Sequence, residues 1–188
     1  MRIVVSGTHA SGKSTLIADF LGLHPGIGHL PDPFEVLGEG QDDPGPASFL
    51  AQLTISARRL VSLDPHERLI AERGPLDFLA YLRAWEDLGR GSVPAEVLER
   101  AEAMISDAMQ NVDLVALLPL NPHDRIWVHD EEDPALRSAM DAALLEIYDD
   151  RDLRGDRATV IELTGDREAR FTALAAAVGA LDSASGLG

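Results

Sequence analysis

The chain has 188 residues, which fits one domain with a substantial core, and its 45% hydrophobic and 26% charged residues are typical of a globular protein. The formal net charge of -16 argues against nucleic acid or an anionic membrane surface as the main partner, because both bind basic surfaces. The absence of cysteine excludes disulfides, thiolate chemistry and a cysteine-ligated metal site.

Short apolar segments along the chain predict the strands of a sheet. Residues 2–6 form a β-branched run that ends at Gly7, as a buried parallel strand does, and they lack the pattern of a signal peptide. No apolar run approaches the about 20 residues that span a membrane, so we expect a cytoplasmic protein. Further strands are predicted just before Pro31 and within residues 68–73, 112–120 and 158–163.

Helical patterns lie between these strands. Apolar faces at helical spacing, together with Gly and Pro start signals, predict helices within residues 13–21, 46–63, 74–89, 94–111, 134–150 and 167–181. Asp133 is the expected N-cap of the helix over 134–150. Strands that alternate with helices predict an α/β fold with a mostly parallel sheet. We expect a single domain over residues 1–182, with residues 183–188 as a flexible tail.

The segment SGTHASGKST, residues 6–15, contains the only lysine of the chain. Residues 7–14 match the pattern G-x-x-x-x-G-K-[ST] between a strand and a helix, where a phosphate-binding loop belongs. The glycines let the backbone curl so that its N–H groups surround phosphate oxygens, and the following helix directs its positive end at the same anion. We expect the nucleotide to be bound by Gly7, Thr8, His9, Ala10, Ser11, Gly12, Lys13, Ser14 and Thr15.

The chemistry of this loop predicts ATP and Mg²⁺ as cofactors. Lys13 would reach the β- and γ-phosphates as a point charge, and the Ser14 hydroxyl would ligate Mg²⁺. Glu72, at the end of the third strand, would hold Mg²⁺ or its waters. Arg73 follows it, able to neutralise charge on the transferred phosphoryl group or to bind the acceptor.

Two acidic residues are candidates for binding or activating the acceptor. Asp32 follows the second strand, at the edge where α/β proteins bind ligands, and it is the candidate base for an acceptor hydroxyl, with Glu35 as the alternative. The competing interpretation of Asp32 is a solvated loop carboxylate. Asp77 lies in the first turn of a helix, where it would bind the acceptor or only complement the helix dipole.

Four segments together resemble the P-loop nucleoside and nucleotide kinases, especially the deoxyribonucleoside kinase and the AAA-type nicotinamide-riboside-kinase-like groups: SGTHASGKST, LPDPFEVL, FLAQLTISARRL and ERGPLDFLAYL. The resemblance implies a three-layer α/β/α P-loop NTPase fold with a five-stranded parallel sheet of order 2-3-1-4-5. It also implies that Asp32 serves as the base and that Gln52 and Arg59 read a nucleobase. The alternative is that Gln52 and Arg59 are only polar residues on the exposed side of their helix, because both lie off its apolar face.

In such kinases an arginine-rich lid closes over the phosphates after the fourth strand. The resemblance implies a lid near residues 121–137 with Arg125 and Arg137 as its arginines, although Arg137 could equally pair with Asp141 one turn along its helix. The segment LTGDREAR resembles the part of these kinases that lies against adenine. It implies backbone contacts from Gly165 and Asp166, with a helix cap as the alternative.

These observations predict an ATP-dependent kinase that transfers the γ-phosphoryl group to a hydroxyl of a nucleoside or nucleoside-like small molecule. The expected partners are a nucleotide and that acceptor, and a homodimer is one option for the assembly. Two alternatives stay open: a regulatory P-loop ATPase or nucleotide switch, and a kinase for a non-nucleoside alcohol such as an antibiotic or sugar. The chain has no guanine-reading N-K-x-D motif, which weakens the GTPase version of the switch.

Overall fold

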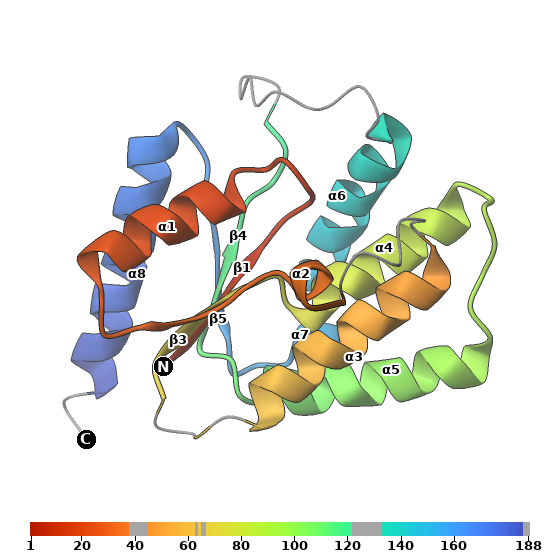
Figure 1. The fold of residues 1–188 in the computed structure, drawn as a ribbon, viewed down its shortest axis with the longest axis horizontal. Helices are drawn as coiled ribbons and strands as arrows, with labels where there is room; N and C mark the ends of the chain where they lie inside the picture. Colours follow the sequence, from red (N-terminus) through yellow and green to blue (C-terminus); the bar gives the residue numbers. More distant parts are fainter. Residues whose placement is uncertain (38–44, 63, 65–66, 122–132, 186–188) are drawn as a thin grey trace.

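The computed structural model describes residues 1–37, 45–62, 64, 67–121 and 133–185, and it contains a parallel sheet between two layers of helices (Figure 1). The strands are β1 (Arg2–Ser6), β2 (Gly28–Leu30), β3 (Leu69–Glu72), β4 (Leu114–Leu117) and β5 (Thr159–Glu162). They form one five-stranded sheet in the order β2-β3-β1-β4-β5, and each neighbouring pair is parallel. The predicted fold class and strand order are therefore confirmed.

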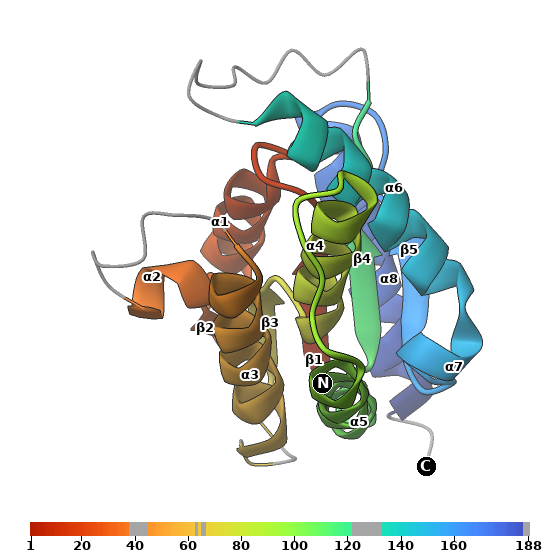
Figure 2. The ribbon, with the colours of Figure 1, turned by 90° about the vertical axis from the view of Figure 1, so that its right-hand side faces the viewer.

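Helices cover both faces of this sheet (Figures 1 and 2). One layer consists of α1 (Lys13–Leu23) and α8 (Arg167–Ser185), which pack against each other. The other layer consists of α3 (Pro46–Ser62), α4 (Pro75–Asp87), α5 (Ala95–Met109) and α6 (Pro134–Asp149). Two short helices, α2 (Pro33–Leu37) and α7 (Arg151–Arg154), complete the described elements.

The central strand β1 divides the hydrophobic core into two parts. Ile3 and Val5 belong to the cluster under α1 and α8, whereas Val4 belongs to the cluster under α3 to α6. Every residue of β1 is buried. Burial on both faces explains why this strand is a continuous apolar run rather than an alternating one.

The predicted helices are all present, with ends that differ by a few residues. Asp133 caps α6 as predicted, since its carboxylate accepts the N–H groups of Ala135 and Leu136. The sequence analysis did not predict α2 and α7, because helices of five and four residues are too short to show a periodic pattern. Helix α8 extends to Ser185, so residues 183–185 continue the helix where we expected a tail, and residues 186–188 lie outside the described part.

The carboxyl ends of the parallel strands lie at one edge of the sheet. The loop of residues 7–12 follows β1, Pro31 and Asp32 follow β2, and Arg73 follows β3. This is the edge where open α/β sheets bind ligands. Within the described ranges, no helix combines the length and the apolar character that crossing a membrane requires.

Candidate active site

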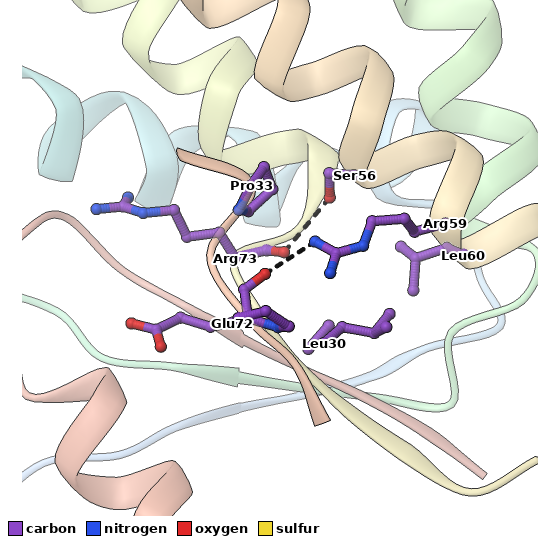
Figure 3. Close-up of a pocket in the computed structure, with 9 residues that line it drawn as sticks. Leu30, Pro33, Ser56, Arg59, Leu60, Glu72 and Arg73 are labelled. Atoms are coloured by element: carbon purple, nitrogen blue, oxygen red, sulfur yellow. Dashed lines mark hydrogen bonds between the residues drawn. The ribbon is translucent and has the colours of Figure 1, made fainter. Parts of the chain in front are cut away.

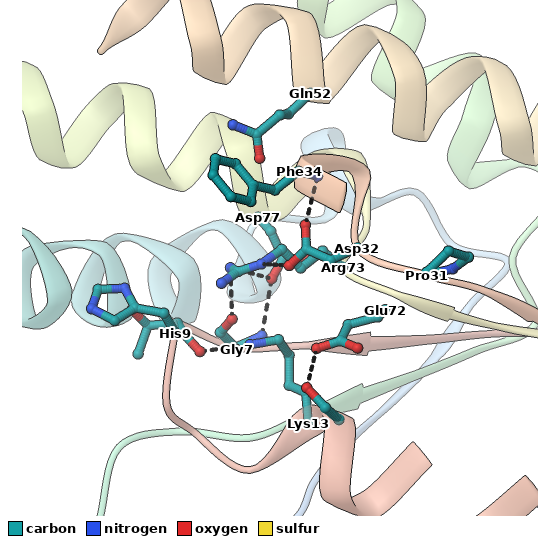
Figure 4. A network of polar contacts seen from close by, with 12 residues as sticks. Gly7, His9, Lys13, Pro31, Asp32, Phe34, Gln52, Glu72, Arg73 and Asp77 are labelled. Carbon is teal, nitrogen blue, oxygen red and sulfur yellow. Dashed lines mark hydrogen bonds and ion pairs between the residues drawn. The ribbon is translucent and has the colours of Figure 1, made fainter. Parts of the chain in front are cut away.

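A cleft of about 320 Å³ opens at this edge of the sheet. Segments that follow three different strands line it: residues 9–15 of the phosphate loop, Asp32, and the pair Glu72 and Arg73. Figure 4 shows the polar groups of these segments directed toward one another. The structure thus brings together the loop and the residues after β2 and β3 that the sequence singles out.

The loop takes the curled form that a phosphate site needs. A Cβ atom on Gly7 would lie 2.8 Å from the carbonyl oxygen of Leu118, so the loop can start there only with glycine. Gly12 has a φ of 95° and is the N-cap of α1. Ala10 also has a left-handed φ, of 49°, which costs an alanine about 1–2 kcal/mol.

Lys13 lies inside this loop, 4% exposed, and its Nζ donates to the carbonyl of Thr8 at 2.7 Å. Burial and the neighbouring Arg73 lower the pKa of Lys13 to about 7, against the opposing effect of nearby carboxylates. A lysine held this way is close to losing its charge in the free protein. An anion that enters the loop restores the charge, because it favours the protonated form.

Ser14 and Glu72 meet where α1 begins and β3 ends. The Ser14 hydroxyl donates to Glu72 Oε1 at 2.7 Å, and Glu72 is 7% exposed. In the described ranges, no cluster of three or more His, Asp or Glu side chains forms a metal site by itself. Two protein oxygens beside a phosphate loop suit Mg²⁺, which keeps several waters and takes further oxygens from the nucleotide.

Arg73 and Asp32 form an ion pair beside the loop. Arg73 Nε donates to Asp32 Oδ2 at 2.7 Å, and Arg73 Nη1 donates to the carbonyl of Gly7 at 3.0 Å. Burial lowers the pKa of Arg73, but Tyr81, Asp32 and Asp77 together hold it above its usual range, so the guanidinium stays charged. The backbone of Arg73 has a φ of 65°, and such strain in a residue other than glycine is concentrated at functional sites.

Asp77 does not face the cleft. It is 0% exposed, and its carboxylate accepts the Ser6 hydroxyl at 2.7 Å and the N–H groups of Gly7 and Gly74, both at 2.9 Å. The Ser6 hydroxyl continues this network to the Tyr148 hydroxyl at 2.8 Å. We expected Asp77 to bind the acceptor, but in the structure it caps α4 and holds the N–H of Gly7, the first residue of the loop.

Gln52 is buried, contrary to the expectation that it lies off the apolar face of its helix. It is 6% exposed, and its Nε2 donates to the Ser48 hydroxyl at 3.0 Å. Ser48, Gln52 and Ser56 are four residues apart, so they form a buried polar stripe on α3. Figure 4 shows the Gln52 amide beside Phe34 and on the same side of the site as Asp32 and Arg73.

Arg59 has a structural contact close to the site. Its Nη1 donates to the carbonyl of Pro31 at 2.9 Å, across a pocket of about 10 Å³ behind Glu72 and Arg73 (Figure 3). The Ser56 hydroxyl, which lines the same pocket, donates to the carbonyl of Arg73 at 3.4 Å. These contacts hold the backbone just before Asp32 and at Arg73, so Arg59 supports the Asp32–Arg73 pair and is not among the residues that line the cleft.

Arg137 contacts the phosphate loop instead of pairing along its own helix. Its Nε donates to the carbonyl of His9 and its Nη2 to that of Ala10, both at 3.1 Å. Asp141 instead accepts the N–H of Leu120 at 3.1 Å. Arg125 and residues 122–132 of the expected lid lie outside the described residues.

Glu35 and the segment of Gly165 and Asp166 were also expected to take part in the site. Glu35 is exposed on α2 and is not among the residues that line the cleft. Asp166 accepts the N–H of Ala169 at 2.9 Å, next to Gly165 with its φ of 88°, so this segment caps α8. The cap that the sequence leaves as an alternative is therefore present, while the contact with adenine stays a prediction.

The sequence analysis missed three residues that hold the site together. Tyr81 places its hydroxyl 3.1 Å from His9 Nδ1, and its ring lies 5.3 Å from the Arg73 guanidinium. Tyr148 joins the Asp77 network, and Arg170 donates to the carbonyl of Ser11 at 3.0 Å. The hydrogen-bond partners of these three residues are more than 70 positions away in the chain, so no local pattern could have found these hydrogen bonds.

The strand order, the two helical layers and the loop after β1 define the fold of the P-loop nucleoside and nucleotide kinases. Neither a protein-family model nor a curated protein sequence matches the chain. Solved structures do match it, among them deoxyadenosine kinase from M. mycoides with products dCMP and a flexible dCDP bound. That match has a TM-score of 0.68 and 15% identity over 96% of this chain and 100% of the other.

Two further matches have the same character. The M. mycoides deoxyadenosine kinase with bound dATP has a TM-score of 0.64 and 14% identity, over 95% of this chain and 99% of the other. Thymidylate kinase from Candida albicans has a TM-score of 0.66 and 16% identity, over 96% of this chain and 92% of the other. At such identities the matches establish the fold alone.

Proposed function

We propose that this protein is an ATP-dependent kinase that phosphorylates a hydroxyl group of a nucleoside or nucleoside-like molecule. One observation carries the proposal: a phosphate loop and the Asp32–Arg73 pair line one cleft. A protein that only binds and hydrolyses a nucleotide does not need the Asp32–Arg73 pair. The solved kinases of the same fold, which include one with bound dATP, support a nucleotide as donor and a nucleoside-like acceptor.

The donor half of the reaction falls to the loop. Its N–H groups and Lys13 bind the β- and γ-phosphates, and Ser14 and Glu72 hold Mg²⁺ with its waters. When bound, Mg²⁺ neutralises part of the charge on these phosphates. The loop is already curled, so little reorganisation is needed when the nucleotide enters.

The acceptor half falls to the residues after β2 and β3. Asp32 accepts the proton of the attacking hydroxyl, and Arg73 meets the charge that develops on the transferred group. Gln52 and the exposed ring of Phe34 lie beside them (Figure 4). An amide and an aromatic face are the groups that a flat, hydrogen-bonding base requires, which favours a nucleoside over a sugar or an antibiotic.

The test is ATP consumption with Mg²⁺ across nucleosides, nucleoside monophosphates and unrelated alcohols. We expect turnover that depends on one acceptor class and is lost in Lys13→Ala. Asp32→Asn should lower kcat by about 10²–10⁴-fold, the usual contribution of a general base. Its matched control is Glu35→Gln, an exposed carboxylate three residues away, which should stay within about twofold of the wild type.

Gln52→Ala tests the nature of the acceptor. It should raise the KM of a nucleoside about tenfold and leave the KM of ATP unchanged, because it removes a hydrogen-bonding group on the acceptor side only. Unchanged acceptor affinity would count against a nucleoside. ATP hydrolysis that no acceptor stimulates would instead support the ATPase or switch alternative and leave Asp32 without a role as base.

A further inference from the structure

The carbonyl groups of the phosphate loop are held by cationic side chains. Each carbonyl from Gly7 to Ser11 accepts a hydrogen bond from one of them: Gly7 from Arg73 at 3.0 Å, Thr8 from Lys13 at 2.7 Å, His9 and Ala10 from Arg137 at 3.1 Å, and Ser11 from Arg170 at 3.0 Å. The donors come from α1, α6, α8 and the turn after β3. Four separate parts of the chain therefore fix one loop of a strongly acidic protein.

These bonds determine where the N–H groups of the loop point. In a planar trans peptide the carbonyl of one residue and the N–H of the next point in opposite directions. A bond from Arg170 to the Ser11 carbonyl thus fixes the direction of the Gly12 N–H. Gly12 is the N-cap of α1, where phosphate-binding loops present N–H groups to the anion.

Arg170 reaches the loop from the α8 side. Its side chain is buried, 7% exposed, and among the described residues it is not part of the cleft lining. Its backbone N–H donates to the carbonyl of Asp166 at 3.0 Å, in the first turn of α8. Arg170 therefore does not line the cleft itself, and it contacts the site through the loop carbonyl of Ser11.

We propose that Arg170 is a positioning residue for the phosphates of the nucleotide. It holds the peptide between Ser11 and Gly12 with its N–H turned into the cleft, and it makes α8 a part of the nucleotide site. The inference rests on the nucleotide-binding part of the proposed function and is independent of the acceptor. An arginine suits this role because it keeps its charge when buried and forms strong charge-assisted hydrogen bonds.

The chain offers a matched control on the same helix. Arg167 lies one turn before Arg170 and forms an exposed ion pair with Asp19 of α1. Arg167→Met and Arg170→Met each remove one positive charge of α8 and the hydrogen bonds of one guanidinium. Only the second variant removes a contact to the phosphate loop.

The experiment is calorimetric titration of the wild type, R170M, R170K and R167M with ATP, and with tripolyphosphate as a probe that has neither base nor sugar. We expect R170M to weaken both ligands about tenfold and alike, the usual cost of losing one charge-assisted hydrogen bond. R170K should be about threefold weaker, because a lysine keeps the charge but lacks the planar fork. R167M should change either affinity by less than about twofold.

Steady-state kinetics supply a second readout. If Arg170 only positions the donor, R170M raises the KM of ATP and leaves kcat and the acceptor KM within about twofold of the wild type. A variant with a general structural defect would instead lose kcat in proportion to the unfolded fraction. Thermal unfolding of each variant, measured alongside, identifies such a defect.

Several outcomes would overturn the proposal. If R170M binds tripolyphosphate like the wild type but binds ATP more weakly, Arg170 acts at the adenine end of the nucleotide and not on the phosphates. If R170M and R167M lose affinity equally, the cause is the lost positive charge on α8 and not the contact with the loop. If R170M does not fold, unchanged affinities in R170K overturn it. A wild type that binds neither ligand refutes the proposed function as well, whereas one that binds ATP but phosphorylates nothing refutes only the kinase activity.

Discussion

Replacing Asp77 by alanine tests the anchor beneath the phosphate loop. The substitution leaves the buried N–H groups of Gly7 and Gly74 without their acceptor, while Ser6 keeps Tyr148 as a partner. Each orphaned N–H costs about 1–3 kcal/mol, so we expect the free energy of unfolding to fall by about 4 kcal/mol. For a chain of this size that lowers Tm by about 8–16 °C.

The assay is denaturant unfolding followed by circular dichroism, with the free energy obtained by linear extrapolation. Asp77→Asn keeps one oxygen that can accept the Gly7 N–H, but its NH₂ group cannot accept the Gly74 N–H. The free energy of unfolding should therefore fall about half as much as in Asp77→Ala. Asp87→Ala removes an exposed carboxylate from the end of the same helix and should change the free energy by less than about 0.5 kcal/mol.

The loss of this anchor should also change one functional constant more than the others. Asp77→Ala should weaken ATP binding, because the first residue of the loop loses its anchor, and should affect the acceptor KM less. A loss of stability below about 1 kcal/mol together with a selective rise in the acceptor KM would refute this view of Asp77. It would return the residue to the acceptor site despite its complete burial.

Three further predictions concern the loop itself. The pKa of Lys13 is about 7 in the free protein and should rise when phosphates bind, so binding should take up a proton above pH 7. The ATP affinity should then fall as the pH increases, by up to tenfold per pH unit. Calorimetry in buffers of different ionisation enthalpy measures the proton uptake, and Lys13→Met should abolish it. Ala10→Gly should stabilise the protein by about 0.5–1 kcal/mol in thermal unfolding, because it relieves a left-handed alanine, and an unchanged or lower stability would show that the loop does not strain this residue. Ser14→Ala should leave ATP binding in EDTA unchanged but remove the gain that Mg²⁺ provides, while an undiminished Mg²⁺ effect would exclude Ser14 as a ligand.

The sequence predicted the parts of the site that depend on short segments. The pattern of residues 7–14 identified the loop, and the ends of β2 and β3 identified Asp32, Glu72 and Arg73, because parallel strands end at one edge of a sheet. The strand order followed from the resemblance, since a strand pattern alone does not say which strands are neighbours.

The errors arose where the tertiary environment decides what a polar residue does. We expected Gln52 to lie off the apolar face of its helix, but together with Ser48 and Ser56 it forms a polar stripe that is buried. Asp77 looks like an ordinary residue of a first helical turn, and only the packing of α4 against β1 shows that it holds Gly7. Contacts such as that of Arg170 with Ser11 join residues 159 positions apart and leave no local trace.

That separation has a consequence for the order of events during synthesis. At about 5–20 residues per second, Arg170 is made about 8–30 s after Ser11. Strand β1, which leads into the loop, lies between β3 and β4 in the sheet, so it can pair fully only after both have been made. The Ser11 carbonyl finds its Arg170 donor only after α8 has been made. A nascent chain therefore contains residues 7–14 long before the contacts that hold this loop can form. If the protein binds a nucleotide as proposed, tight binding requires that the whole domain has folded.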